Sequence, residues 1–178
     1  NSDRIIMTSG NGVFACDNAW AEKGIQFYFD PKGVEEVVAL DMVSVKGGSA
    51  YSAIGDYDGY IHSNVDEIGI QYKPNMGSTG VIAACRQNPD IMVRFAENEG
   101  KGYYSKDAGK TWNEMKDAGG SGGHGDIAKI DDDTYRLFHT NASGIQYSDD
   151  FGDTWSKSTG TVGTKVFGVY VEDSDPSI

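Results

Sequence analysis

The chain has 178 residues, a net charge of −12 and 38% hydrophobic residues, including ten Tyr, seven Phe and three Trp. This apolar content is enough to build a folded core. A surface this acidic repels phosphate backbones and anionic lipids, which argues against nucleic acid and membrane surfaces as partners but not against a neutral polysaccharide.

Glycine and cysteine usage narrows the fold class. The 24 glycines against four prolines indicate many tight turns between short strands. The two cysteines, Cys16 and Cys85, lie far apart in apolar, strand-like stretches, so we expect them to be buried, small hydrophobic residues rather than a metal or disulfide framework. We predict no metal and no cofactor. No stretch approaches the ~20 apolar residues of a membrane helix.

Four segments share one pattern, in which a short strand, a small polar turn that ends in Gly, and a second strand follow one another. The segments are residues 4–16, 50–64, 92–107 and 136–149. Their turn glycines, at 12, 59, 102 and 144, are 47, 43 and 42 residues apart. A period of this length indicates a repeat architecture.

The stretches between these segments predict strands and connectors. Residues 33–45 have the β-branched content of a strand and end at Lys46-Gly47-Gly48, which favours a strand over a helix. Residues 118–125, AGGSGGHG, predict a flexible loop between strands, and Asp131-Asp132-Asp133 predicts a solvated hairpin tip. His124 and His139 have no Ser or Cys partner at a recognisable spacing, so we expect ordinary surface or strand residues.

One eight-residue phrase occurs twice, as SKDAGKTW at 105–112 and SDDFGDTW at 148–155. An Asp that can bond backbone N–H groups, a Gly that permits positive φ and a Trp that packs together predict a hairpin turn. The phrase resembles the Asp-box of sialidase-like β-propellers, which implies a structural role. The predicted structural residues are Ser105, Asp107, Gly109, Thr111, Trp112, Ser148, Asp150, Gly152, Thr154 and Trp155.

The period and the boxes together predict an all-β fold, a β-propeller with four-stranded blades. The chain is expected to be a single propeller segment of about four blades, in repeat units of approximately 1–30, 31–75, 76–117 and 118–160, with 161–178 beginning the next blade. Asp-box propellers generally have six or more blades. We therefore expect this segment to belong to a larger propeller of the seven-bladed type.

A more specific resemblance runs through the first 115 residues. The chain shows, in order, NSDRI at its start, Gly33-Val34-Glu35-Glu36, Asp41, SAIGDYDGYIH at 52–62 and NPDIMVR at 88–94. This order resembles glycoside hydrolase family 74, the endo-xyloglucanases and oligoxyloglucan-specific hydrolases. The resemblance implies a secreted, inverting hydrolase of xyloglucan or a related β-1,4-glucan, with two propellers facing each other across a cleft.

The resemblance also implies a catalytic residue. The family phrase Gly-Asp-x-x-Gly-[Phe/Tyr]-x-His falls on residues 55–62, so the general acid carries over to Asp56, with Tyr60 and His62 as substrate-binding candidates. The family usually continues with two acidic residues, and here Ser63-Asn64 follow, a departure that predicts a weakened or divergent member. The general base comes from the first propeller, so this chain alone is expected to be inactive and to need the rest of its propeller or a second propeller domain for a complete cleft.

Other interpretations remain open. DYDG at 56–59 is also a good turn sequence with no catalytic implication, and it resembles a calcium loop only faintly. The alternative function is a non-catalytic propeller that binds glycan or protein, as sortilin-like and photosystem-assembly propellers do. A sialidase is disfavoured, because the arginines are accounted for as blade positions. Trp20 is a further candidate for sugar binding, although such aromatics are more often core residues.

Overall fold

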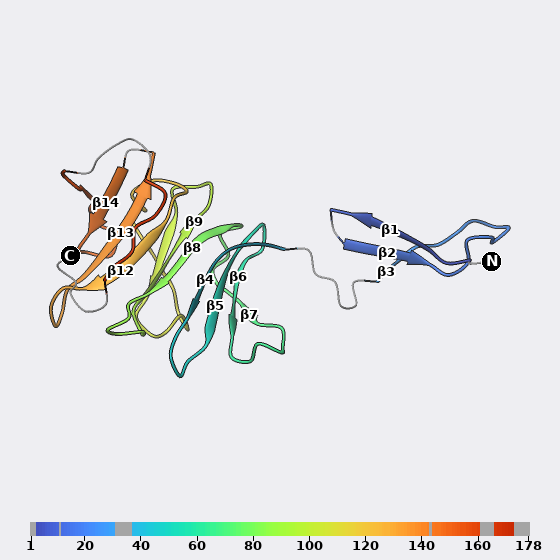
Figure 1. The fold of residues 1–178 in the computed structure, drawn as a ribbon, viewed down its shortest axis with the longest axis horizontal. Coiled ribbons are helices and arrows are strands. Elements are labelled where there is room, and N and C mark those ends of the chain that lie inside the picture. Colours follow the sequence, from blue (N-terminus) through green and yellow to red (C-terminus); the bar gives the residue numbers. More distant parts are fainter. Residues whose placement is uncertain (1–2, 11, 31–36, 143, 161–165, 173–178) are drawn as a thin grey trace. The chain divides into compact units, whose positions relative to one another are not determined.

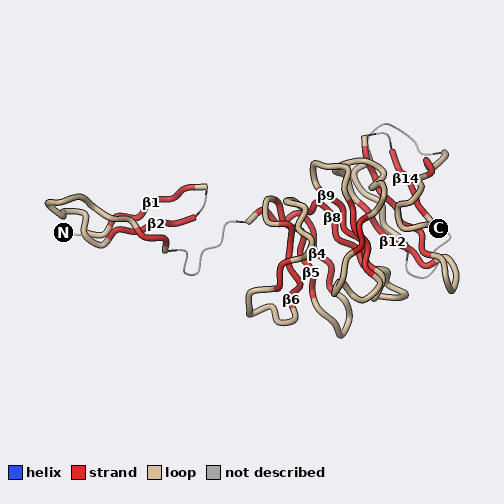
Figure 2. The backbone as a smooth tube through the Cα atoms, turned by 180° about the vertical axis from the view of Figure 1, so that it is seen from behind, coloured by secondary structure: helices blue, strands red, loops and turns tan. Residues whose placement is uncertain are grey.

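The computed structural model describes residues 3–10, 12–30, 37–142, 144–160 and 166–172. The chain divides into two compact units, residues 1–37 and 38–178, and each is described by itself (Figure 1). All regular elements in the described ranges are strands, joined by turns and loops (Figure 2). No helix that could cross a membrane occurs in them. That the whole chain forms one continuous propeller segment stays a prediction.

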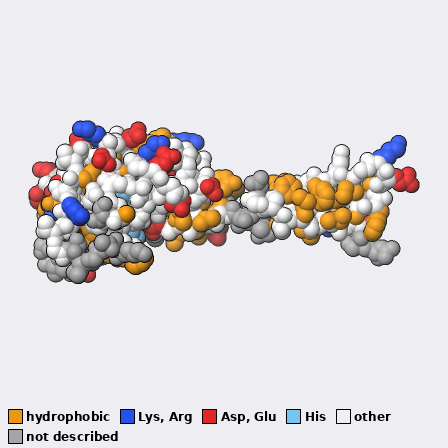
Figure 3. Space-filling view, turned by 90° about the horizontal axis from the view of Figure 1, so that it is seen from above, with side chains coloured by type: hydrophobic (Ala, Val, Ile, Leu, Met, Phe, Trp, Pro, Cys, Tyr) orange, Lys and Arg blue, Asp and Glu red, His pale blue; other side chains and the backbone are white. Residues whose placement is uncertain are grey.

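The described residues of the unit 1–37 form one antiparallel sheet. Its strands are β1 (Ile5–Ser9), β2 (Gly12–Cys16) and β3 (Tyr28–Phe29), in the order β1-β2-β3. Among the described residues this sheet has three strands, where a blade of four is predicted. Phe14 packs on Phe29 with ring centroids 5.2 Å apart, and hydrophobic side chains gather on the surface of this unit (Figure 3).

The described residues of the unit 38–178 form three four-stranded antiparallel sheets, each in chain order, as expected of propeller blades. The first sheet consists of β4 (Val38–Ser44), β5 (Ala50–Gly55), β6 (Asp58–His62) and β7 (Ile70–Gln71). The second consists of β8 (Thr79–Ala84), β9 (Met92–Ala96), β10 (Gly102–Ser105) and β11 (Asn113–Glu114). The third consists of β12 (Gly125–Lys129), β13 (Tyr135–Asn141), β14 (Gly144–Ser148) and β15 (Ser156–Lys157).

The expected hairpins and the expected strand at 33–45 are present. The strand covers residues 38–44, and residues 33–36 lie outside the described part. In the predicted next blade, residues 161–165 and 173–178 also lie outside it. Residues 166–172 form no strand, but the N–H of Val171 donates to Asp126 Oδ2 at 2.8 Å. The start of another blade there stays a prediction.

The middle sheet is buried on both faces, which is why β9 is buried along its whole length. Side chains alternate between the faces of a strand, so Val93 and Phe95 enter one core and Met92 the other. The core shared with the first sheet includes Tyr51, Tyr72, Ile82, Met92, Tyr103 and Trp112. The core shared with the third sheet includes Val81, Cys85, Ile91, Phe95, Ile127 and Leu137. Cys16 and Cys85 are both buried, as expected.

The loop of residues 118–124 wraps around His139 of β13, a side chain with no exposed surface. The ring stacks on Phe95 at 4.3 Å. Its Nδ1 and Nε2 lie 2.7 Å and 2.6 Å from the carbonyl oxygens of Ala118 and Gly122. His139 is a strand residue, as expected, but it also holds in place a loop that the sequence predicts to be flexible.

The burial of His139 predicts a pH dependence of stability. Burial lowers the pKa of His139, and this effect outweighs the opposing contacts with the two carbonyls. Below the unfolded value of about 6.5, the unfolded chain therefore binds a proton that the folded chain resists. We expect the free energy of unfolding to fall as pH drops from about 6.5 toward the lower folded pKa. Urea unfolding between pH 8 and pH 5 measures it.

A Gln in place of His139 is the matched comparison, because its amide can donate to one carbonyl but does not titrate. His139→Gln is expected to be less stable at pH 8, with a shallower loss of stability on acidification. Parallel pH profiles for the two proteins would contradict the assignment.

Candidate functional site

The two boxes form the same local hydrogen-bond network. In the first, Asp107 Oδ1 accepts the Thr111 N–H at 2.8 Å and Oδ2 accepts the Thr111 hydroxyl at 2.6 Å. Ser105 Oγ accepts the Gly109 N–H at 2.8 Å. The Thr111 hydroxyl contributes most to lowering the pKa of Asp107. A left-handed pair, Ala108 and Gly109, turns the chain.

The second box repeats these contacts. Asp150 accepts the Thr154 N–H at 2.9 Å and its hydroxyl at 2.6 Å, and Ser148 Oγ accepts the Gly152 N–H at 2.9 Å. Here too a left-handed pair, Phe151 and Gly152, turns the chain. The polar side chains of both boxes are thus engaged in closing a turn, which supports a structural role for the boxes.

The box tryptophans pack between sheets. Trp112 is 9% exposed, and its ring centroid lies 5.7 Å from that of Tyr72, which belongs to the connection after β7. Trp155 is half-buried; it packs edge-on against Phe95 at 6.3 Å and donates its indole N–H to the Asp117 carbonyl at 2.8 Å. Each tryptophan therefore joins its own sheet to the preceding one.

The turn between β5 and β6 contains the predicted general acid. Asp56 and Asp58 both have left-handed φ, at 67° and 69°, which Asp tolerates better than most residues. Gly59 follows, and a Cβ there would stand 1.9 Å from the Ser52 carbonyl oxygen. The sequence DYDG therefore meets a backbone requirement whether or not it carries chemistry.

Asp58 points inward. Its side chain has no exposed surface and forms an ion pair with Arg94 Nη1 at 2.8 Å. Oδ1 also accepts the Thr79 hydroxyl, and Oδ2 accepts the Met76 N–H at 3.0 Å. The backbone N–H of Asp58 donates to the Gly77 carbonyl at 2.8 Å. Asp58 thus anchors the turn to residues 76–79, which lead into the second sheet.

Arg94 is enclosed by aromatic rings. Its guanidinium carbon lies 5.0, 4.7 and 4.9 Å from the ring centroids of Tyr72, Tyr103 and Trp112. Nη2 donates to the Pro74 carbonyl at 2.5 Å, while Nε is buried and has no hydrogen-bond partner among the described residues. This arginine occupies a blade position, as expected from sequence, and joins the first sheet to the second.

Asp56 points outward from the same turn. Its side chain is exposed, and among the described residues no donor bonds its carboxylate. Its backbone is held, because the Asp56 N–H donates to Ser78 Oγ at 2.7 Å. The Tyr57 carbonyl accepts the Gln71 side-chain amide at 2.9 Å. The result is a free carboxylate on a fixed turn.

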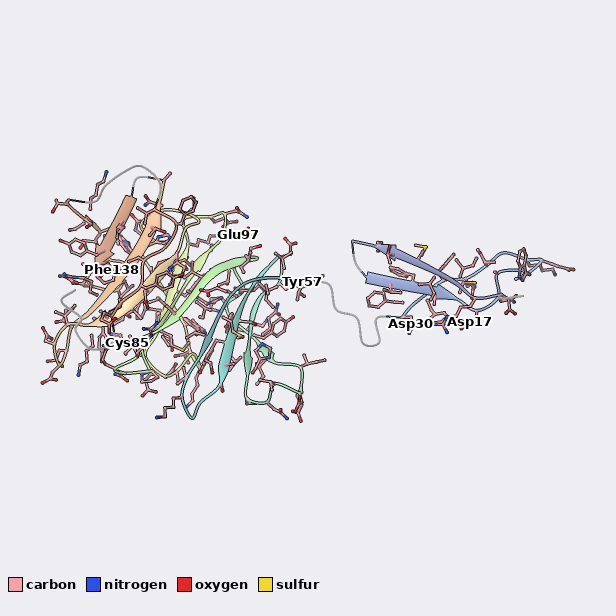
Figure 4. All side chains as sticks on the ribbon, in the orientation of Figure 1. Asp17, Asp30, Tyr57, Cys85, Glu97 and Phe138 are labelled. Atoms are coloured by element: carbon pink, nitrogen blue, oxygen red, sulfur yellow. The ribbon has the colours of Figure 1, made fainter. Side chains whose placement is uncertain are left out.

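A second carboxylate lies beside this turn. The Glu97 N–H donates to the Ser78 carbonyl at 3.0 Å, and Glu97 Oε2 lies 3.8 Å from the position that a Cβ on Gly55 would take. Figure 4 shows Glu97 and Tyr57 in the upper right part of this unit, with Cys85 toward its lower left. Sequence reasoning missed Glu97, although its place in the β9–β10 turn corresponds to that of Asp56 in the β5–β6 turn.

Tyr60 and His62 lie together along β6. Their rings are 6.2 Å apart. Ser52 Oγ accepts the Tyr60 N–H at 3.2 Å and lies 3.0 Å from His62 Nε2. These residues therefore line a face of the first sheet and not the turn itself, and their role in binding stays a prediction.

Trp20 lies in the unit of residues 1–37, in the connection between β2 and β3, and is 75% exposed. The same connection lines a cavity of about 400 Å³. Its lining residues are Cys16, Asp17, Asn18, Ala21, Gly24, Ile25, Gln26, Phe27 and Tyr28. Sugar binding by Trp20 stays a prediction.

Within the described ranges, no group of three or more His, Cys, Asp or Glu side chains is placed to hold a metal ion. In DYDG, Asp58 forms an ion pair with Arg94 and Asp56 points outward.

Known proteins share both the boxes and the wider pattern. The model of the BNR/Asp-box repeat matches residues 103–114 and 146–157. A xyloglucanase of a Paenibacillus species is 30% identical over an alignment of 178 positions that covers 90% of this chain. The family 74 enzyme of Niastella koreensis is 36% identical with a TM-score of 0.64 over 88% of this chain. The family 74 xyloglucanase of Xanthomonas campestris is 28% identical, with a TM-score of 0.66 over 91%.

The resemblance to glycoside hydrolase family 74 is confirmed. The all-β propeller fold is confirmed with it, since the family 74 structures superpose on most of the chain. The chain spans 17% of the Paenibacillus xyloglucanase and 22% and 25% of the two family 74 structures. It therefore corresponds to a minor part of each family 74 protein.

Proposed function

We propose that this chain is part of an inverting glycoside hydrolase that acts on xyloglucan or a related β-1,4-glucan, with Asp56 as the general acid. The observation that carries the proposal is the Asp56 turn, where the backbone is fixed and the carboxylate is free and exposed. An inverting hydrolase needs one carboxylic acid at the leaving oxygen and one carboxylate ~6.5–9.5 Å away that activates water.

The rest of the propeller completes the protein in this proposal. Val38, Leu40 and Met42 of β4 are 58%, 38% and 67% exposed. Propeller blades bury such apolar residues against their neighbours. These apolar side chains are suited to packing against another blade, and the general base is assigned to the other propeller. Because a polysaccharide is too large to enter a cell intact, we also propose that the enzyme is secreted.

The test is xyloglucan hydrolysis by the full-length protein and its Asp56→Asn variant. We expect kcat to fall by about 100-fold or more, the usual loss when a general acid is removed. An aryl glycoside with a good leaving group needs little protonation, so on that substrate the variant should lose far less. Stereochemistry of the product, followed by NMR, should show inversion.

Asp132→Asn is the matched control, because Asp132 is an exposed aspartate at the β12–β13 tip. It should leave both rates unchanged. Wild-type rates for Asp56→Asn would remove Asp56 from the mechanism, and a full-length protein that binds xyloglucan without cleaving it would favour a non-catalytic binding propeller.

A further inference from the structure

We propose that Ser78 is a positioning residue for Asp56. This inference rests on the proposed function, since it assigns the part of the fold that aims the general acid. Ser78 lies 22 residues after Asp56, in the connection between the first and second sheets, where sequence reasoning assigned no role.

Ser78 forms hydrogen bonds with both turns of the candidate site. Its hydroxyl oxygen accepts the Asp56 N–H at 2.7 Å, and its carbonyl accepts the Glu97 N–H at 3.0 Å. It also forms a parallel bridge with Asp58. The one residue therefore ties the β5–β6 turn, which carries Asp56, to the β9–β10 turn, which carries Glu97.

The hydroxyl bond is the contact that holds Asp56 itself. Asp56 adopts left-handed φ, a conformation that persists in a non-glycine residue when its surroundings fix it. Among the described residues, the Ser78 hydroxyl is the acceptor of the Asp56 N–H. Without it, the direction of the carboxylate is less well defined, and a displacement of about 1 Å at a reacting group can cost about 100-fold in rate.

The rest of the β5–β6 turn does not depend on the Ser78 hydroxyl for its contacts with the second sheet. Asp58 is held independently by Arg94, by Thr79 and by the Met76 N–H. Ser78→Ala should therefore fold with a melting temperature close to that of wild type. Its effect is expected on proton donation, so kcat on xyloglucan should fall by about tenfold with little change in KM.

The experiment measures kcat and KM of the full-length protein on xyloglucan and on an activated aryl glycoside. The variants are Ser78→Ala, Ser78→Thr, Asp56→Asn and the Ser78→Ala/Asp56→Asn double variant. Ser44→Ala, an exposed serine at the far end of β4, is the matched control and should behave as wild type. Ser78→Thr keeps the hydroxyl and should retain most of kcat.

A residue that acts only through the Asp56 carboxyl group has no further effect once Asn has replaced that group. The double variant should therefore be no slower than Asp56→Asn alone. Ser78→Ala should also lose less on the activated substrate than on xyloglucan. A double variant that is a further tenfold slower would overturn the inference, as would Ser78→Thr being as slow as Ser78→Ala. If Asp56→Asn is inactive and Ser78→Ala is fully active, the inference fails while the proposed function stands. If Asp56→Asn is fully active, both fail.

Discussion

Replacing Arg94 by Met is expected to lower the free energy of unfolding of residues 38–178 by about 3–5 kcal/mol, the usual cost of removing one partner from a buried ion pair. The Asp58 carboxylate has no exposed surface and sits 2.8 Å from Arg94 Nη1. Met is unbranched and can fill the space between Tyr72, Tyr103 and Trp112, so the loss should come chiefly from the unpaired carboxylate. Denaturant unfolding of the chain measures it.

A double-mutant cycle separates the ion pair from the packing. Asp58→Asn keeps a residue that tolerates left-handed φ but removes the charge, and it should also be destabilising because Arg94 is then unpaired. The Arg94→Met/Asp58→Asn protein has neither buried charge, so its loss should be well below the sum of the single losses. Additive losses would show that the two side chains are not energetically coupled.

The two Asp-box turns could be predicted from the sequence because their side-chain hydrogen bonds join residues close together in the chain. Asp107 bonds Thr111 four residues away, and Ser105 bonds Gly109 at the same separation. A phrase of eight residues therefore contains both partners of each of these side-chain hydrogen bonds. Its repetition revealed the blade period, and the spacing of the turn glycines then predicted the hairpins at β5–β6, β9–β10 and β13–β14.

The candidate site was harder to predict because its partners come from different sheets. DYDG contains two aspartates two residues apart, and nothing local says that Asp58 is buried and Asp56 exposed. That difference depends on Arg94, 36 residues from Asp58. Ser78 and Glu97 are brought to the Asp56 turn by the packing of the second sheet on the first, which no single repeat encodes. The resemblance to family 74 indicated which aspartate to consider, but not what holds it.

The second large effect is expected in the loop around His139. Gly123→Ala should destabilise the chain by more than about 4 kcal/mol, a loss that only severe structural conflicts produce. A Cβ at this position would stand 1.7 Å from the Thr140 carbonyl oxygen. The strand cannot easily move away, because the Thr140 N–H donates to the His124 carbonyl at 2.7 Å and its hydroxyl accepts the His124 N–H at 2.7 Å.

Gly77→Ala is the control that isolates the steric conflict from backbone strain. Gly77 and Gly123 have similar left-handed φ, +89° and +80°, but a Cβ on Gly77 would meet no atom within 4 Å. Left-handed strain alone costs about 1–2 kcal/mol, so Gly77→Ala should lose that amount and remain folded. Both variants lose stability through left-handed backbone strain. The difference between their unfolding free energies therefore measures how rigidly Thr140 holds the loop. Equal losses would mean that the loop moves away from β13 at little cost, and that the contacts of His139 with Ala118 and Gly122 do not fix it.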